Sequence, residues 1–362
     1  MKTASSNPGF LHRGRLRRAS ADRRLGEMAE VLAGKKRLLV LTHDHPDPDC
    51  IASGWGLLKV IRRLRRMTVD FGYGGTIGRS ENRTLRDVLQ VPLVPISTLD
   101  LESYDAFALV DSQPETGNNS LPIGLLPTIV IDHHPCRRRT REVPYFDVRE
   151  DYGATATIVA EYLAAADAPI DRRLATAFFY AIKTETRNLG REASRADVRA
   201  FLEFFPRVDN VALSAIEHPR IPRAYFAMID RLIAGAQVQG RFVTALLGPV
   251  EPPEVVAEFA DMLVRMEDAD WALAIGRYRG SLLLSLRTNL TSVNAGRIIQ
   301  RIVRSEGTAG GHGMMAGGRV TPPAGSEADP AALDRLERAL LTRARRLVGA
   351  PARGGPLVQR GK

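Results

Sequence analysis

From residue 37 onward, short apolar runs alternate with segments whose apolar residues have helical spacing, and few folds accommodate such an alternation. The run at 37–42 is typical of a buried strand. Further strands are expected at 67–71, 106–110 and 128–131, and helices at 21–32, 51–66, 81–89, 154–166 and 172–182. Alternating strands and helices favour an α/β fold with a doubly wound, mainly parallel sheet that is covered on both faces.

A segment with several prolines separates this first region from a second one. Residues 206–222 contain three prolines and are interpreted as a linker. Beyond it, strands are expected at 237–247, 271–277 and 281–287, followed by a helix at 294–304, a glycine-rich loop and a final helix after Asp329. The expected parts are a basic segment with a helix at 1–35, a first domain at 36–205, the linker, a smaller α/β domain at 223–348 and a mobile tail at 349–362.

Composition excludes several classes of protein. With 44% hydrophobic and 25% charged residues over 362 positions, the chain is typical of a globular protein of two domains. No run of 18 uncharged apolar residues occurs, so neither a membrane span nor a membrane partner is expected. Cys50 and Cys136 do not suffice for a disulfide framework or a thiolate zinc site, which favours a reducing, cytoplasmic setting.

The formal net charge of +10 is concentrated at the two ends of the chain. Residues 1–37 carry +7 and residues 331–362 carry +6, so the stretch between them is slightly acidic. The basic character therefore describes two ends and not a site. Such ends are typically solvated or solubilising, with association with RNA as the alternative.

Ligand-type residues gather directly after the first expected strand, in the stretch His43-Asp44-His45-Pro46-Asp47-Pro48-Asp49. Open α/β sheets hold their sites at the ends of strands. Asp47 and Asp49 are two residues apart in a proline-stiffened loop, so each carboxylate can serve a different metal ion. The alternative is a helix N-cap. Capping requires one acid, whereas this stretch holds three acids and two histidines, which favours a metal site.

Two further strand ends carry ligand-type residues. Asp111 closes the strand at 106–110, where a lone acid is also compatible with a turn cap. Asp132, His133 and His134 follow the strand at 128–131. Adjacent histidines on a loop face different ways, so one can bind a metal while its neighbour faces a substrate. Four of the seven histidines lie in these motifs, which argues against chance.

Together these motifs resemble the DHH phosphoesterase family. The set His43-x3-Asp47-x-Asp49, Asp111 after a strand, Asp132-His133-His134 and Gly310-Gly311-His312 occurs in the family's order over roughly residues 36–325. The resemblance implies a two-domain enzyme with a pair of Mn²⁺ ions on the first domain, or Mg²⁺ as the alternative. It also implies a second domain that grips the substrate across a cleft.

The resemblance further implies roles for individual residues. The implied metal ligands are His43, Asp47 and Asp111 for one ion, and Asp49, Asp111, His133 and the acid of a fourth motif for the other. Carboxylates and imidazoles without thiolates suit Mn²⁺ or Mg²⁺, and two such ions can activate a water and stabilise phosphoryl charge. His134 would face the phosphate as a donor or general acid, and Asp132 would orient a histidine.

The fourth motif departs from the family pattern. The family usually carries Asp within a Thr-Asp-Thr sequence, and the aligned stretch here is Thr184-Glu185-Thr186. Glu185 can ligate the same ion with one more methylene, so we expect it to be a ligand. The alternatives are a shifted or weakened second metal, or a solvated acid in a surface turn.

In the second domain, the resemblance implies a grip on the terminal phosphate and sugar of a nucleotide. The expected substrate-binding residues are Arg287, Asn289, Gly310, Gly311 and His312. By contrast, the glycines at 72–78 have the wrong spacing for a dinucleotide fingerprint, and we expect a loop there. The helix start at 152–155 is expected to be a simple N-terminal turn, with a phosphate site as the alternative.

A compact chain with only these two domains most resembles the nanoRNase/pAp phosphatase branch of the family. The expected function is therefore that of a Mn²⁺-dependent two-metal phosphoesterase acting on very short oligoribonucleotides (nanoRNA) and 3′-phosphoadenosine 5′-phosphate (pAp). Alternatives within the family are a cyclic-dinucleotide phosphodiesterase or an exopolyphosphatase. Outside enzymes, the alternatives are a weakly active nucleotide-binding regulator or an RNA-associated protein. A homodimer is left open.

Overall fold

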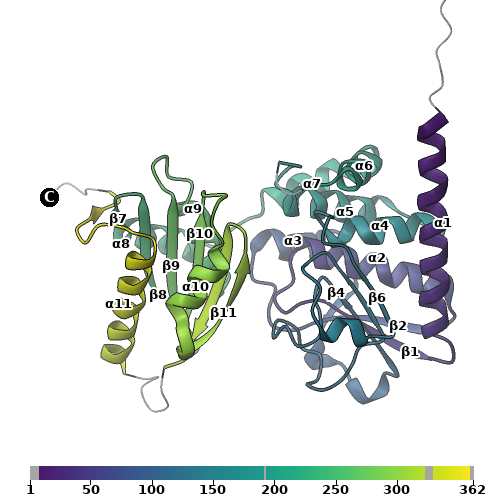
Figure 1. Ribbon diagram of the computed structural model, residues 1–362, viewed down its shortest axis with the longest axis horizontal. Coiled ribbons are helices and arrows are strands. Elements are labelled where there is room, and N and C mark those ends of the chain that lie inside the picture. Colours follow the sequence, from purple (N-terminus) through teal and green to yellow (C-terminus); the bar gives the residue numbers. More distant parts are fainter. Residues whose placement is uncertain (1–7, 191–192, 323–328, 359–362) are drawn as a thin grey trace, which may run out of the picture. The chain divides into compact units, whose positions relative to one another are not determined.

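The structure is a computed structural model that describes residues 8–190, 193–322 and 329–358 (Figure 1). It divides into two compact units, Met1–Pro219 and Arg220–Lys362. The boundary lies inside the expected linker, but most of that linker is folded. It contains the 3-10 turn η4 (Phe205–Arg207) and helix α7 (Asn210–Glu217), and α7 packs against helix α3 (Ser80–Val88) of unit 1.

Unit 1 is built on a six-stranded sheet in which every neighbouring pair of strands is parallel. The strands are β1 (Arg37–Leu41), β2 (Thr68–Tyr73), β3 (Leu93–Pro95), β4 (Ala106–Val110), β5 (Ile129–Asp132) and β6 (Tyr145–Val148). Their order is β3-β2-β1-β4-β5-β6, so the chain winds one way from β1 and the other way from β4. This confirms the predicted sheet. It also puts the topological switch between β1 and β4, where open α/β sheets hold their sites.

The two faces of this sheet are covered differently. One face carries helices α2 (Pro48–Leu64), α4 (Thr155–Ala165) and α5 (Arg172–Glu185). Leu38 and Val40 of β1 belong to the core on that face, whereas Leu39 and Leu41 pack with apolar residues of loops and 3-10 turns on the other. Because successive strand residues point to opposite sides, the continuous apolar run of β1 is buried on both faces.

Helix α1 (Pro8–Val31) begins earlier than the helix expected at 21–32. Ala21, Leu25 and Met28 are buried along one side of it, a spacing that turns an apolar stripe toward the core. Arg24 from the same helix forms an ion pair with buried Asp147 of β6. The other elements of unit 1 are η1 (Ile96–Thr98), η2 (Leu101–Ser103), η3 (Arg139–Glu142) and α6 (Arg195–Phe204).

Unit 2 is a seven-stranded mixed sheet with helices, in agreement with the predicted second α/β unit. The strands are β7 (Gln237–Gln239), β8 (Phe242–Pro249), β9 (Trp271–Tyr278), β10 (Ser281–Thr288), β11 (Gly307–His312), β12 (Met315–Val320) and β13 (Gly355–Pro356). Their order is β11-β12-β10-β9-β8-β7-β13. The helices are α8 (Arg223–Gly235), α9 (Val255–Leu263), α10 (Ala295–Val303), the 3-10 turn η5 (Arg304–Glu306) and α11 (Pro330–Leu347).

Three local expectations for unit 2 differ from the structure. The single strand expected at 237–247 is the hairpin β7–β8, which turns at Gly240. The expected glycine-rich loop is the hairpin β11–β12, because glycines carry no side chain and so hide the alternation that marks a strand. The tail expected to be mobile from residue 349 is tied down in part, since β13 pairs with β7. Residues 359–362 of that tail lie outside the described residues.

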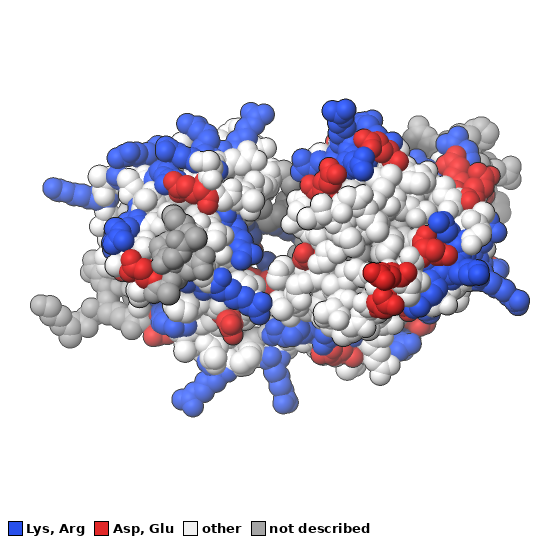
Figure 2. All heavy atoms as spheres, turned by 90° about the horizontal axis from the view of Figure 1, so that it is seen from below, with Lys and Arg blue, Asp and Glu red and all other residues white. Residues whose placement is uncertain are grey.

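The described helices include none that is long and apolar enough to cross a membrane. On the face shown in Figure 2, lysine and arginine side chains project from both units, with acidic side chains among them.

Candidate metal centre

The stretch after β1 starts helix α2, and Asp47 is its N-cap. Oδ1 of Asp47 accepts hydrogen bonds from the N–H groups of Asp49 (3.0 Å) and Cys50 (3.1 Å). Pro48 follows at the first helical position, where a missing N–H costs nothing. The N-cap alternative is therefore correct for Asp47. The same Oδ1 lies 3.6 Å from Nε2 of His43, so the carboxylate that caps the helix also lies beside this imidazole.

Two histidines from different strand ends converge on Asp111. Nδ1 of His43 lies 2.9 Å from the carbonyl oxygen of Asp44, and Nδ1 of His133 lies 3.1 Å from that of Tyr152. A carbonyl only accepts, so each Nδ1 carries a proton, and Nε2 is the ring nitrogen that would bind a metal ion. Nε2 of His43 is 3.6 Å from Oδ2 of Asp111, and Nε2 of His133 is 3.6 Å from Oδ1.

Asp111 has a backbone conformation that few residues adopt. Its φ is +55°, a left-handed value that Asp and Asn tolerate better than most residues. Its N–H donates to the Ile131 carbonyl of β5 (2.9 Å), and its Oδ1 accepts from the Thr155 hydroxyl (2.8 Å). The side chain is only 4% exposed. Asp111 is thus fixed between β4 and β5 with its carboxylate in the cluster.

Asp49 lies in the first turn of α2 but caps a different helix. Its Oδ2 accepts from the N–H of Thr155 and its Oδ1 from that of Ala156, both at 2.8 Å, at the start of α4. Because these N–H groups are occupied, the simple turn expected at 152–155 is what the structure shows. Burial raises the pKa of Asp49 well above its ordinary value, and neighbouring carboxylates, led by Asp111, raise it further.

Glu185 is the last residue of α5 and is partly buried. Its negative charge contributes to the raised pKa values of Asp49 and His134, so it lies near the cluster. The chain then makes a left-handed turn, with positive φ at each of residues 187–189. Strained backbone of this kind costs on the order of 1 kcal/mol or more per residue and tends to occur at functional sites. The role of Glu185 as a metal ligand stays a prediction.

Asp132 organises the loop that carries the adjacent histidines. Its Oδ1 accepts from the N–H groups of His133 (2.8 Å) and His134 (3.2 Å) and lies 2.9 Å from Nδ1 of His134. Its Oδ2 accepts from the Gln113 amide (2.7 Å). Burial alone would lower the pKa of His134, but the Asp132 hydrogen bond and nearby carboxylates outweigh it and raise the pKa to about 9. The two imidazole planes meet at 63°, but Nδ1 of His134 and Nε2 of His133 lie 3.7 Å and 3.6 Å from the same Oδ1 of Asp111. Both rings therefore approach one carboxylate, which differs from the expectation that adjacent histidines face different ways.

Among the described residues, potential metal ligands form two groups. These are His43, Asp47 and Cys50, and Asp111, His133 and His134, with the ligand atoms of each group within 4.8 Å of one another. Nε2 of His133 is buried and makes no hydrogen bond, a deficit that a cation would remove. Buried carboxylates whose pKa values are raised are likewise stabilised by a cation. The cluster therefore fits a metal ion, while Asp49 and Glu185 fall outside both groups and remain predicted ligands.

Cys50 is buried beside His43 and Asp47. Its thiol donates to the Asp47 carbonyl (3.4 Å), and burial raises the pKa of Cys50 to about 12. A thiol with so high a pKa stays protonated at neutral pH. Cys50 is thus the small packed side chain expected from the sequence, although it lies in the ligand cluster.

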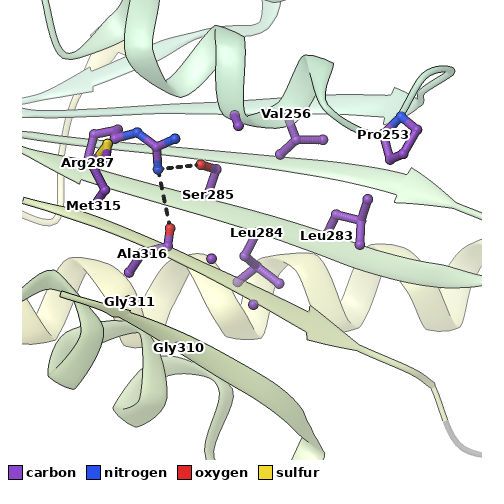
Figure 3. A pocket seen from close by; sticks show the side chains of 13 residues that line it. Pro253, Val256, Leu283, Leu284, Ser285, Arg287, Gly310, Gly311, Met315 and Ala316 are labelled. Atoms are coloured by element: carbon purple, nitrogen blue, oxygen red, sulfur yellow. Dashed lines mark hydrogen bonds between the residues drawn. The ribbon is translucent and has the colours of Figure 1, made fainter. Parts of the chain in front are cut away.

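In unit 2, Arg287 lines a pocket of about 450 Å³ whose walls are largely apolar (Figure 3). Nε of Arg287 donates to Asp261 (2.6 Å), and Nη1 donates to the Ser285 hydroxyl (2.8 Å) and to the Ala316 carbonyl (3.4 Å). Within the described part of the chain, no group accepts a hydrogen bond from Nη2. The guanidinium is thus held firmly, with one nitrogen available to a ligand.

The other predicted substrate-binding residues have different surroundings. Gly310 and Gly311 line the same pocket. Gly311 has a φ of +147°, and a Cβ there would lie 2.4 Å from a carbonyl oxygen of β12, so only glycine fits. The Asn289 amide donates to two backbone carbonyls in the segment 264–269, which commits its N–H groups to the fold of unit 2. His312 ends β11, and its side chain lies outside the described part.

Three side chains of these sites were not predicted from the sequence. They are Gln113, Thr155 and Asp261. Each forms a hydrogen bond with a side chain that is at least 19 residues away in the chain, and no local sequence motif predicts such a pair. The loop expected at 72–78 is only partly correct, because residues 72 and 73 are the end of strand β2. Residues 74–78 do form a loop, and there Gly75 (φ +68°) lies close to the His45 ring.

The fold and the cluster define a two-domain α/β protein with a candidate metal centre at the switch point of its parallel sheet. Residues 37–182 match the DHH family N-terminal domain, and residues 239–342 match the DHHA1 domain. The first unit therefore carries a DHH family N-terminal domain, and the second unit carries a DHHA1 domain.

The chain is also similar to known proteins. An uncharacterized protein of Methanocaldococcus jannaschii is 32% identical over 320 residues, and the chain spans 83% of its own length and 65% of that relative. An exopolyphosphatase-related protein from Bacteroides fragilis has a TM-score of 0.66 at 13% identity, covering 90% of this chain and 98% of that one. The DHH domain of a member of the s1p family of ribosomal proteins scores 0.50 at 14% identity, covering 92% and 91%. At these identities, the two structures are similar in fold.

Proposed function

We propose that the chain is a metal-dependent phosphoesterase that hydrolyses small phosphorylated nucleotides such as nanoRNA and pAp. The observation that carries this proposal is the convergence of two histidine Nε2 atoms, each fixed by a backbone carbonyl at its Nδ1, on the Asp111 carboxylate. Fixing a histidine through its other ring nitrogen is how proteins orient metal ligands. The DHH and DHHA1 matches support the class of reaction.

The residues that would hold the ions are His43, Asp47, Asp49, Asp111, His133 and Glu185. This oxygen-rich set with two imidazoles suits Mn²⁺, with Mg²⁺ as the alternative. When bound, such ions supply an activated water and stabilise charge on the phosphoryl group.

The protein's own side chains would orient the substrate. Nδ1 of His134 lies 2.9 Å from Oδ1 of Asp132, and the ring would face a phosphate oxygen as a donor. In unit 2, Nη2 of Arg287 would donate to a second phosphate group of the nucleotide, and Gly310 and Gly311, which line the same pocket, would lie near its sugar. The resemblance adds His312 to this set. Both groups bind phosphate through charge-assisted hydrogen bonds.

A phosphate-release assay in Mn²⁺ tests the proposal. The panel is pAp, dinucleotides, cyclic dinucleotides, pyrophosphate and polyphosphate, with the Asp111→Asn protein as the inactive control. We expect release from pAp and products from dinucleotides. Turnover restricted to polyphosphate or to cyclic dinucleotides would instead identify one of the other activities considered for the family. Binding of nucleotides without turnover of any substrate would identify a regulator.

A further inference from the structure

Directly after the adjacent histidines lies a strongly basic segment that the proposed reaction does not use. We call residues 136–142 the arginine loop, because it holds Arg137, Arg138, Arg139 and Arg141 with one acid, Glu142. Its last four residues form the 3-10 turn η3. A high density of arginine beside a candidate phosphate site suggests a ligand with more than one phosphate.

The arginine loop is attached to the histidine loop through Gln113. Oε1 of Gln113 accepts from the N–H of Arg137 and from the hydroxyl of Thr140, both at 2.7 Å. The amide nitrogen of the same buried side chain donates to Oδ2 of Asp132 (2.7 Å), which orients the histidines. One amide group therefore fixes the arginine loop relative to the candidate metal centre.

Among the described residues, only one of the four arginines in the loop forms ion pairs. Arg139 pairs with Glu142 and lies 3.5 Å from Glu115. Glu150 accepts from the Cys136 N–H (3.0 Å). The remaining three arginines are exposed and have no carboxylate partner among the described residues; they are Arg137, Arg138 and Arg141.

We propose that the arginine loop binds the backbone phosphates of a single-stranded oligonucleotide whose reacting end lies in the metal centre. The inference rests on the proposed function for the place of that end, but the binding itself needs no hydrolysis. A residue spans at most about 3.6 Å, so the Cα atom of Arg137 lies within about 11 Å of that of His134. Guanidinium groups at this distance can reach phosphates next to the reacting one.

The charges favour a polyanion over a single phosphate. Several unpaired like charges in one loop repel one another in the free protein, and that repulsion is relieved when successive phosphates bind. Binding of this kind releases counterions, and for single strands each neutralised phosphate adds about 0.7 to the slope of log affinity against log salt concentration. The number of arginines in contact is therefore measurable.

The test compares two double variants that remove the same charge. The first is Arg137→Gln with Arg138→Gln. The control is Arg63→Gln with Arg66→Gln, which are exposed residues at the far end of α2. At about 1.5 Å per helical residue, Arg63 lies about 24 Å along the helix axis from its N-cap. All four positions are exposed, so both proteins should fold, which a thermal melt checks.

Binding of fluorescein-labelled penta-adenylate is followed by anisotropy in EDTA, from about 50 to about 300 mM KCl. We expect the arginine-loop variant to bind roughly tenfold more weakly at the lowest salt, with a salt slope reduced by about 1.4, while the control keeps the slope of the unmodified protein. Equal slopes in the two variants would overturn the inference. So would displacement of the oligonucleotide by polyphosphate of equal charge at equal concentration, which would assign the loop to polyphosphate. Since no turnover occurs in EDTA, the result is independent of the phosphate-release assay.

Discussion

The cluster of unit 1 and the pocket of unit 2 use charge in different ways. In unit 1, buried carboxylates face each other and two imidazoles, and burial and mutual repulsion raise the pKa values of Asp49 and Asp111. In unit 2, Arg287 lies against apolar walls and its charge is balanced by Asp261. The negative charge of the first site needs a cation to balance it. In the second site the charge of Arg287 is already balanced, and Nη2 of its guanidinium group can donate to an anion.

This difference has a physical consequence for each site. A buried group of like charges gains several kcal/mol when a counterion binds, whereas an arginine already paired with a carboxylate gains little more than one charged hydrogen bond from a new ligand. We therefore expect large effects from substitutions in unit 1 and moderate, substrate-dependent effects from those in unit 2.

The largest effect is expected for Asp111→Asn. Asparagine tolerates the left-handed backbone of residue 111, so the change removes the charge shared by His43 and His133 without adding strain. Hydrolysis should fall by at least about a hundredfold, together with Mn²⁺ affinity measured by calorimetry. Asp151→Asn, an exposed acid, serves as the matched control. Wild-type rates and metal content in Asp111→Asn would show that the centre lies elsewhere.

The second-largest effect is expected for Asp147, a buried carboxylate of unit 1 that already forms ion pairs with Arg24 and Arg149. Burial alone would raise its pKa, but Arg149, Tyr162 and Arg24 outweigh this and lower it. A lowered folded-state pKa stabilises the protein above the unfolded value of about 3.9 and stops doing so as the pH falls through the folded value. Asp147→Asn should therefore cost about 3 kcal/mol at pH 7, and the difference from the unmodified protein should shrink below about pH 4.

Urea unfolding followed by fluorescence measures this and separates the two units. Trp55 lies in unit 1 and Trp271 in unit 2, so proteins with one tryptophan replaced by phenylalanine report on one unit each. We expect the transition seen by Trp55 to shift in Asp147→Asn and that seen by Trp271 to stay. A difference that is constant from pH 7 to pH 3 would contradict the assignment.

In unit 2, Arg287→Ala should cost about 1.5 to 3 kcal/mol, or roughly ten- to a hundredfold in kcat/KM, on pAp or dinucleotides. The loss on p-nitrophenyl phosphate should be much smaller, because that substrate has no second phosphate for the arginine to hold. Arg265→Ala, an exposed arginine after α9, is the control. Equal losses on both kinds of substrate would mean that Arg287 serves only the packing of the pocket.

The smallest effect is expected for Glu185. If it ligates an ion, Glu185→Asp should retain or raise activity, since it restores the family's residue, and Glu185→Ala should weaken Mn²⁺ binding by about tenfold. Calorimetric titration of the two variants compares them directly. Identical titrations of Glu185→Ala and the unmodified protein would make Glu185 a bystander acid.

Sequence was sufficient for the parts of the molecule whose signal is local. The buried strands, and the residues that follow β1, β4 and β5, could be placed because an apolar run and the polar residues after it are contiguous. Parallel strands bring their carboxyl ends to one edge, so contiguity in sequence becomes proximity in space. That argument places His43, Asp111 and His133 at the ends of neighbouring strands, whereas their sharing of metal ions was implied by the family resemblance.

What could not be predicted depends on contacts between distant segments. Asp49 caps α4 through N–H groups more than 100 residues away, and Asp261 pairs with Arg287 from another element. Neither pairing has a local pattern. The β11–β12 hairpin was missed for a different reason, because a strand rich in glycine has no alternating side chains to reveal it.

The capping contacts of Asp47 and Asp49 have a consequence for how such chains change over time. Both carboxylates hold the first turns of helices, α2 and α4, and losing an N-cap costs about 1 kcal/mol whether or not the chain performs any chemistry. A descendant that lost its catalytic activity would still be under selection to keep these two acids for folding. The presence of these two acids in a related sequence is therefore weak evidence that the related protein is active. Loss of Asp111 or His133 would be better evidence that it is inactive.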